Sequence, residues 1–182
     1  MIPSLYLSIA RESILKRFSK LEMDKKALLA AHPELSEPKA TFVTLTLHGQ
    51  LRGCIGSLVA HRPLLDDLIS NAQSAAFHDP RFLPLTPAEF TETNIEVSLL
   101  SEPKLVSYTD KADLKSRIHP RTDGVILRVG NYQATFLPQV WEELNDFETF
   151  FAHLGMKAGI GNDPLEYHPE IYTYQVEKIK ED

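Results

Sequence analysis

Residues 40–58 read ATFVTLTLHGQLRGCIGSL, and this stretch decides the fold. From Ala40 to Leu47 apolar side chains alternate with threonines over eight residues. Such alternation is typical of a strand that buries one face. The apolar members are Val43, Leu45 and Leu47. His48-Gly49-Gln50 is a tight-turn sequence, and residues 51–58 run back as the partner strand. The stretch therefore predicts a β-hairpin.

The flanking segments predict more strands in hairpins, and helices between them. Before the hairpin, apolar residues recur at three- and four-residue steps from Leu7 to Leu21, which indicates an opening helix. Because strand and helix do not alternate regularly, we expect an α+β fold with a mostly antiparallel sheet flanked by helices. The other expected elements are a loop at 32–38, helices at 63–77, 86–89, 110–118 and 138–159, strands at 95–99 and 171–179, and a hairpin of 125–129 with 132–137.

Length and charge narrow the class of protein. The 182 residues suit a single domain spanning 1–182, and 43% hydrophobic residues are typical of a soluble globule. The net charge of −6 argues against non-specific nucleic-acid binding and against a polybasic membrane contact. No secretory leader and no membrane-spanning apolar run is visible, so we expect a cytoplasmic protein.

Familiar catalytic and cofactor motifs are missing from the sequence. There is no phosphate loop, no GxGxxG, no HExxH and no GxSxG. The single cysteine excludes an internal disulfide and any CxxC motif, and no two histidines have the spacing of a metal-ligand pair. The sequence therefore predicts neither a cofactor nor a metal.

The most unusual segment is LRGCIG, residues 51–56, in which two glycines flank the only cysteine. Glycine inside a strand marks a bulge or a close approach of another group. In an unbroken strand, Arg52, Cys54 and Gly56 would share one face. Arg52 would then favour the thiolate of Cys54, so both are candidate catalytic residues, and Gly53 and Gly56 would leave space for a ligand. Alternatively, Cys54 is a small packing residue, or a reactive thiol without catalytic function.

A second cluster, HDPRF at 78–82, predicts a rigid loop of the kind on which sites are mounted. Asp79 could orient His78, or accept a bidentate bond from Arg52 or Arg81. These residues are candidate ligand contacts, or they fasten the loop to the body of the protein. His48 lies across the hairpin turn from Cys54, which leaves a Cys–His pair open.

Two further candidates follow the predicted hairpin at 125–137. Gln139 falls in the first turn of a predicted helix, where free backbone N–H groups attract anions. Lys157 lies near the end of that helix and could offer a cation to a ligand, although a lysine there also suits the helix dipole. Either residue is equally compatible with a purely structural role.

Several ordered blocks resemble one family. LRGCIG is similar to the hexapeptide typical of the AMMECR-one domain family, and further blocks follow in the family's order over most of the chain. They are Phe42-Val43-Thr44-Leu45, Ala76-Phe77, Asp79-Pro80-Arg81-Phe82, Val97-Ser98-Leu99-Leu100, Gly124-Val125-Ile126, Leu137-Pro138-Gln139-Val140-Trp141 and Lys157-Ala158-Gly159. The resemblance implies one α+β domain with a larger and a smaller lobe and with LRGCIG near a groove between them.

The resemblance leaves the activity open. It implies no established catalytic residue, but prokaryotic members of the family often accompany a Memo-like protein and a radical S-adenosylmethionine protein. We therefore weigh two hypotheses: a component of such a system that acts through the LRGCIG groove, or a stand-alone enzyme that uses the Cys54 thiolate on a small molecule. Expected partners are those two proteins or a small-molecule ligand, and neither nucleic acid nor membrane.

Overall fold

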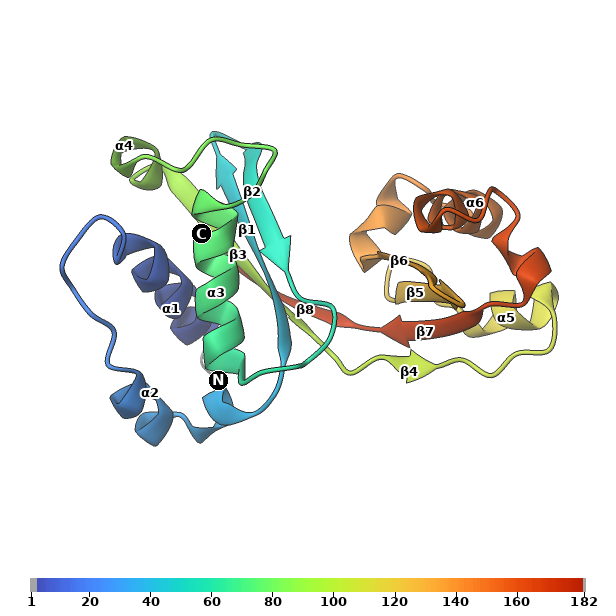
Figure 1. Ribbon diagram of the computed structural model, residues 1–182, viewed down its shortest axis with the longest axis horizontal. Helices are drawn as coiled ribbons and strands as arrows, with labels where there is room; N and C mark the ends of the chain where they lie inside the picture. The colour runs from blue at the N-terminus through green and yellow to red at the C-terminus, as the bar shows by residue number, and fades with distance from the viewer. Residues whose placement is uncertain (1–2, 182) are drawn as a thin grey trace. The chain divides into compact units, whose positions relative to one another are not determined.

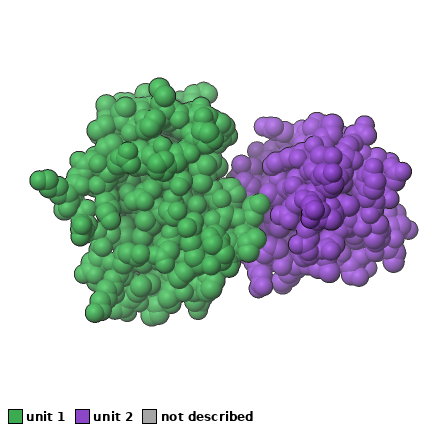
Figure 2. All heavy atoms as spheres, in the orientation of Figure 1, with its two compact units in different colours: residues 1–100, 177–182 green, residues 101–176 purple. Residues whose placement is uncertain are grey.

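The computed structural model describes residues 3–181, which form two compact units, each built around one four-stranded antiparallel sheet (Figures 1 and 2). Unit 1 is the chain up to Leu100 together with the segment from Glu177 onward, and unit 2 is Ser101–Val176. This arrangement confirms the predicted α+β class with antiparallel pairing. Within residues 3–181, no helix combines the length and the apolar character needed to cross a membrane.

The sheet of unit 1 has the strand order β2-β1-β3-β8. Its strands are β1 (Ala40–Leu47), β2 (Gln50–Gly56), β3 (Thr93–Leu100) and β8 (Val176–Lys180). The predicted hairpin of β1 and β2 is confirmed, and His48 and Gly49 take up the positive φ angles (51° and 78°) of its two-residue turn. Val43 and Leu45 are fully buried, as the alternation predicted.

Helices cover one face of this sheet (Figure 1). They are α1 (Pro3–Leu15), α2 (Lys25–Ala31), the 3-10 helix η1 (Pro33–Ser36), α3 (Leu64–Phe77) and α4 (Pro87–Phe90). The predicted opening helix is too long, and α2 and η1 were not predicted. The apolar spacing continues past the end of α1 as far as Phe18, which lies in a turn. Phe18 is apolar because its ring packs on Phe77 and Phe90, not because it belongs to the helix. Leu21 is 70% exposed and belongs to no helix.

Unit 2 places its sheet, in the order β4-β7-β5-β6, against α6. Its elements are β4 (Lys104–Leu105), α5 (Lys111–Arg117), β5 (Gly124–Val129), β6 (Tyr132–Phe136), η2 (Pro138–Glu142), α6 (Phe147–Ala158), η3 (Pro164–Tyr167) and β7 (Glu170–Tyr174). The hairpin of β5 and β6 is confirmed, and Gly159 ends α6 in the left-handed conformation (φ 88°) that is typical of a glycine C-cap.

Two sequence predictions fail in the C-terminal half. The helical region predicted from Pro138 is two helices, because the Asp146 side chain caps a new helix by accepting from the backbone N–H of Thr149. The predicted closing strand is also divided. Its first part, β7, pairs with β5 in unit 2, whereas β8 joins the sheet of unit 1 and buries Ile179 in that core.

Candidate functional site

The LRGCIG segment contains a β-bulge at Arg52. Gly53 pairs with Leu45, whereas Leu51 pairs with Thr46, so that Arg52 has no partner opposite it in β1. A bulge adds one residue to a strand and redirects its side chain. The predicted common face of Arg52 and Cys54, which assumed an unbroken strand, is therefore wrong at this point.

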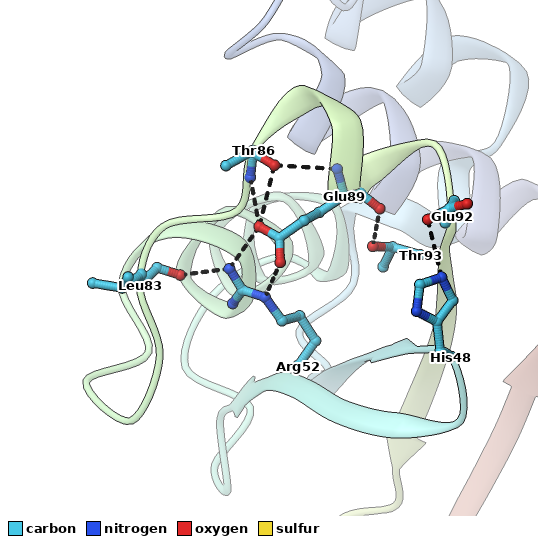
Figure 3. A network of polar contacts seen from close by, with 7 residues as sticks. All are labelled: His48, Arg52, Leu83, Thr86, Glu89, Glu92 and Thr93. Carbon is cyan, nitrogen blue, oxygen red and sulfur yellow. Dashed lines mark hydrogen bonds and ion pairs between the residues drawn. The ribbon is translucent and has the colours of Figure 1, made fainter.

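The guanidinium of Arg52 is held by α4 rather than by Cys54 (Figure 3). Its Nε and Nη2 donate to the Glu89 carboxylate at 2.9 and 3.1 Å, and Nη2 also donates to the carbonyl of Leu83 at 2.7 Å. Glu89 in turn closes a capping box with Thr86. The hydrogen bond from Arg52 lowers the pKa of Glu89 to about 2. Arg52, only 11% exposed, thus fastens α4 and its preceding loop to β2.

The two glycines of the segment are used for close packing. A methyl group on Gly53 would overlap with the backbone carbonyl of Ala75 in α3, and one on Gly56 would overlap with the ring of Phe42. The open space that the sequence interpretation placed over these glycines is therefore filled by protein. Their absent side chains let α3 and an aromatic ring lie directly on the strand. A role for either glycine in ligand binding stays a prediction.

Cys54 is half-buried, and neighbouring residues make hydrogen bonds to its backbone as well as to its thiol. The sulfur lies 3.3 Å from the hydroxyl of Thr44 on the neighbouring strand. The backbone N–H of Cys54 donates to Asp79 at 3.0 Å, and its carbonyl accepts from Nη2 of Arg81 at 3.3 Å. Because β2 is an edge strand, these two side chains occupy positions that a further strand would take. We call Asp79, Arg81 and the backbone of Cys54 the edge clamp.

Charge strengthens the edge clamp. Asp79 is 4% exposed and accepts two bonds from the Arg81 guanidinium, at 3.0 and 2.7 Å. These bonds hold the pKa of Asp79 well below its usual range. The pKa of Arg81 is raised, chiefly by its hydrogen bond to Asp79. The guanidinium beside Cys54 is therefore that of Arg81, which lies 27 residues further along the chain, and not that of Arg52.

The loop that carries the clamp is held by several side-chain contacts and presents two exposed side chains. The ring of Phe82 lies near both guanidinium groups, 5.7 Å from Arg52 and 5.4 Å from Arg81. Leu85 is buried and anchors the end of the loop. In the same loop, the Arg81 side chain is 54% exposed and Leu83 is 83% exposed. A fixed loop thus presents a cation and an apolar side chain to solvent.

The remaining predicted site residues lie away from the edge clamp or make other contacts. His78 is exposed at the end of α3, and His48 contacts Glu92 at 2.9 Å, not Cys54 (Figure 3). Gln139 and Lys157 belong to unit 2. Gln139 is exposed on η2, and Lys157 donates to the carbonyl of Thr135 at 2.9 Å. Their predicted ligand contacts stay predictions.

A buried polar network that sequence reasoning missed lies at the start of α3. The Asp67 carboxylate, with a side chain 1% exposed, accepts from the backbone N–H and hydroxyl of Thr41, from Ser57 and from Arg62, at 2.7–2.8 Å. Asn71 adds its amide to the same group. The available signal was a carboxylate and an amide four residues apart on the apolar face of a helix. This network joins α3 to β1 and to Ser57, the residue that follows β2.

The thiol of Cys54 makes few side-chain contacts within the described part of the chain. Among residues 3–181, the one side-chain hydrogen bond of Cys54 is with Thr44, and no three His, Cys, Asp or Glu side chains gather as a metal site would require. A nucleophilic thiol is normally paired with a base such as histidine. What the site provides instead is a fixed strand edge, with a charged and an apolar side chain held beside it.

The chain is thus an α+β protein with two antiparallel sheets and with LRGCIG on a clamped sheet edge. It belongs to the AMMECR1 family, whose model matches residues 7–179. A protein of Methanothermobacter thermautotrophicus is 41% identical over 147 residues, which are 79% of this chain and 76% of that protein. One of Methanocaldococcus jannaschii is 36% identical over 162 residues, 86% and 81% of the two chains. The crystal structure of the uncharacterized protein PH0010 from Pyrococcus horikoshii superposes with a TM-score of 0.83 at 32% identity, covering 98% of this chain and 90% of that one.

Proposed function

We propose that this protein is a partner-binding component of a system that also contains a Memo-like protein and a radical S-adenosylmethionine protein. The contact surface in this proposal is Leu83 together with the exposed part of Arg81, whose guanidinium is held by Asp79. The proposal rests on one observation above all, the hydrogen bonds by which Asp79 and Arg81 hold the peptide groups of Cys54. They fix the exposed loop before any partner arrives.

A fixed loop is well suited to binding because little side-chain and loop entropy is lost when the complex forms. Arginine is enriched at binding hot spots, and an exposed leucine beside it adds apolar area. Leu83 is 83% exposed although its carbonyl is held by Arg52, so its exposure does not come from a loose loop. The partner expected here presents an apolar pocket with a carboxylate at its edge.

Binding to recombinant Memo-like and radical S-adenosylmethionine proteins from the same genome tests the proposal. We expect Leu83→Ser and Arg81→Glu to weaken binding at least tenfold in biolayer interferometry. Leu83→Ser is the cleaner variant because its side chain makes little contact with the fold. Arg121→Glu in unit 2, also exposed and with no ion pair among residues 3–181, is the matched charge control. Equal binding by all variants, or no binding by the parent protein, would contradict the proposal.

The alternative function is a stand-alone enzyme with Cys54 as a thiolate nucleophile. One observation favours it: the Arg81 guanidinium, a permanent cation, lies at the backbone of a thiol that solvent partly reaches. Iodoacetamide separates the two functions. A nucleophilic Cys54 alkylates faster than free cysteine at pH 7, whereas a thiol that only packs against Thr44 alkylates more slowly. Arg52→Glu is unsuitable for either test, because Arg52 holds α4 in place.

A further inference from the structure

A surface hollow in unit 1 is lined by cationic side chains and by no carboxylate. Its volume is about 270 Å³, and its lining residues are Lys16, Arg17, Gln73, Phe77 and His78. It lies where α1 and α3, which pack side by side, both end. The lining thus combines two permanent cations, an imidazole, an amide and an aromatic ring. We propose that this hollow binds a small phosphate monoester.

Neither of the two cations has an ion-pair partner among residues 3–181. Six of the eight arginines form ion pairs among residues 3–181, whereas Arg17 does not, and Lys16 is likewise unpaired there. With a net charge of −6, the chain has ample carboxylates to pair them. Lys16 also borders a second hollow, which Glu12 and Glu22 line, yet neither carboxylate lies within ion-pair distance of it. An unpaired cationic cluster on an acidic protein attracts anions locally.

The ends of the two helices do not account for these cations. Lysine and arginine are favoured at a helix C-terminus because free carbonyls there carry partial negative charge. Here four of the carbonyls at these helix ends already have donors. The carbonyl of Ser13 accepts from the Gln73 amide, those of Ile14 and Leu15 accept from backbone N–H groups, and that of Ser74 accepts from the N–H of His78. The cations are therefore left to face the hollow.

The shape and charge of the hollow indicate which anion fits. The guanidinium carbon of Arg17 lies 4.9 Å from the centroid of the Phe77 ring, within the range of a cation–π contact. A planar guanidinium binds phosphate oxygens in pairs, and a nearby ammonium adds a point charge. Two permanent cations match a phosphate dianion better than a single carboxylate. About 270 Å³ is just below the range of drug-sized sites, roughly 300–1,000 Å³, and suits a small ester.

Backbone amide shifts in NMR titrations test the proposal on the intact chain. The probes are glycerol 3-phosphate, inorganic phosphate and succinate, each at constant ionic strength set with chloride. We expect saturable shifts confined to residues 16–18 and 73–78, with glycerol 3-phosphate binding most tightly and succinate most weakly. Shifts that rise linearly without saturating, or succinate binding as tightly as the phosphate ester, would overturn the assignment.

Variants then locate the site. The double change Lys16→Gln with Arg17→Gln should weaken glycerol 3-phosphate binding at least tenfold, and Lys16→Gln alone by a smaller factor while keeping the Arg17–Phe77 contact. The matched control, Lys26→Gln with Arg121→Gln, removes one lysine and one arginine that are also exposed and unpaired, and should bind as the parent does. Equal weakening in the control would show general charge screening and sink the proposal. No partner protein enters this test, so it is independent of the proposed function.

Discussion

The carboxylate of Asp79 accepts the backbone N–H of Cys54 at 3.0 Å, although 25 residues separate them in sequence. This hydrogen bond is made by the main chain of Cys54, so it holds the strand edge in place independently of the thiol. Asp79 is held from its other side by Arg81. Together, these contacts make the LRGCIG segment and the HDPRF loop a single structural feature.

Removing the charge of Asp79 should loosen this feature. Asp79→Asn places an amide against the Arg81 guanidinium and should lower the free energy of unfolding by roughly 1–3 kcal/mol. The iodoacetamide rate of Cys54 should rise, because its strand edge opens more often. Urea denaturation and timed alkylation measure the two effects. Asp113→Asn, which loosens the exposed Asp113–Arg117 pair, should change stability by less than about 1 kcal/mol. Equal losses in both variants would contradict the buried-clamp interpretation.

The two LRGCIG glycines should differ in whether a second change rescues them. Gly53→Ala and Gly56→Ala should each destabilise by roughly 1–3 kcal/mol, because the added methyl overlaps with occupied space. At Gly56 the obstacle is the Phe42 side chain, so Phe42→Leu should recover part of the loss. At Gly53 it is the Ala75 backbone, which no substitution removes. Thermal unfolding of the single and double variants measures whether Phe42→Leu restores stability. If Phe42→Leu also rescued Gly53→Ala, the proposed difference between the two glycines would be wrong.

The Arg52–Glu89 pair should stabilise the fold above about pH 5 and lose its effect in acid. The folded pKa of Glu89 is about 2, below its unfolded value of about 4.3. A lowered folded pKa gives stability that is present above the unfolded value and is lost as pH falls towards 2. Glu89→Gln should therefore lower stability at pH 7 by roughly 1–3 kcal/mol and flatten its pH dependence between 5 and 2. Urea denaturation across that pH range measures the change in stability, with the exposed Glu92→Gln variant as the control. If the stability of Glu89→Gln and that of the parent protein fell in parallel as the pH was lowered, the prediction would be wrong.

The Asp67 network should be the most sensitive polar feature of unit 1. Asp67→Ala leaves the buried groups of Thr41 and Ser57 without their acceptor, and we expect a loss of about 3–5 kcal/mol. Its neighbour Asp66 forms an exposed pair with Lys25, so Asp66→Ala should change stability by less than about 1 kcal/mol. Chemical denaturation compares the stability of the two variants. A small loss for Asp67→Ala would contradict the prediction and mean that water takes over the hydrogen bonds of the carboxylate.

The candidate site shows where sequence reasoning stops. Asp79 with Arg81 was among the pairings considered, and it is the one that the protein uses. Which arginine lies beside Cys54 was predicted wrongly, because the extra residue at Arg52 breaks the two-residue period from which its face was assigned. The Asp67 network was missed because the sequence alone does not distinguish a buried carboxylate from a solvated one. The difference is set by hydrogen-bond partners that come from other segments of the chain.

The hairpin, its buried face and the antiparallel α+β class were determined by the sequence itself, because alternation between apolar and polar side chains is a local property of eight or so residues. The tertiary structure alone decided the bulge, the edge clamp and the division of residues 170–180 between two sheets. Each of these depends on contacts between segments that are far apart along the chain. Such contacts are selected by packing and charge in three dimensions, and no local period records them.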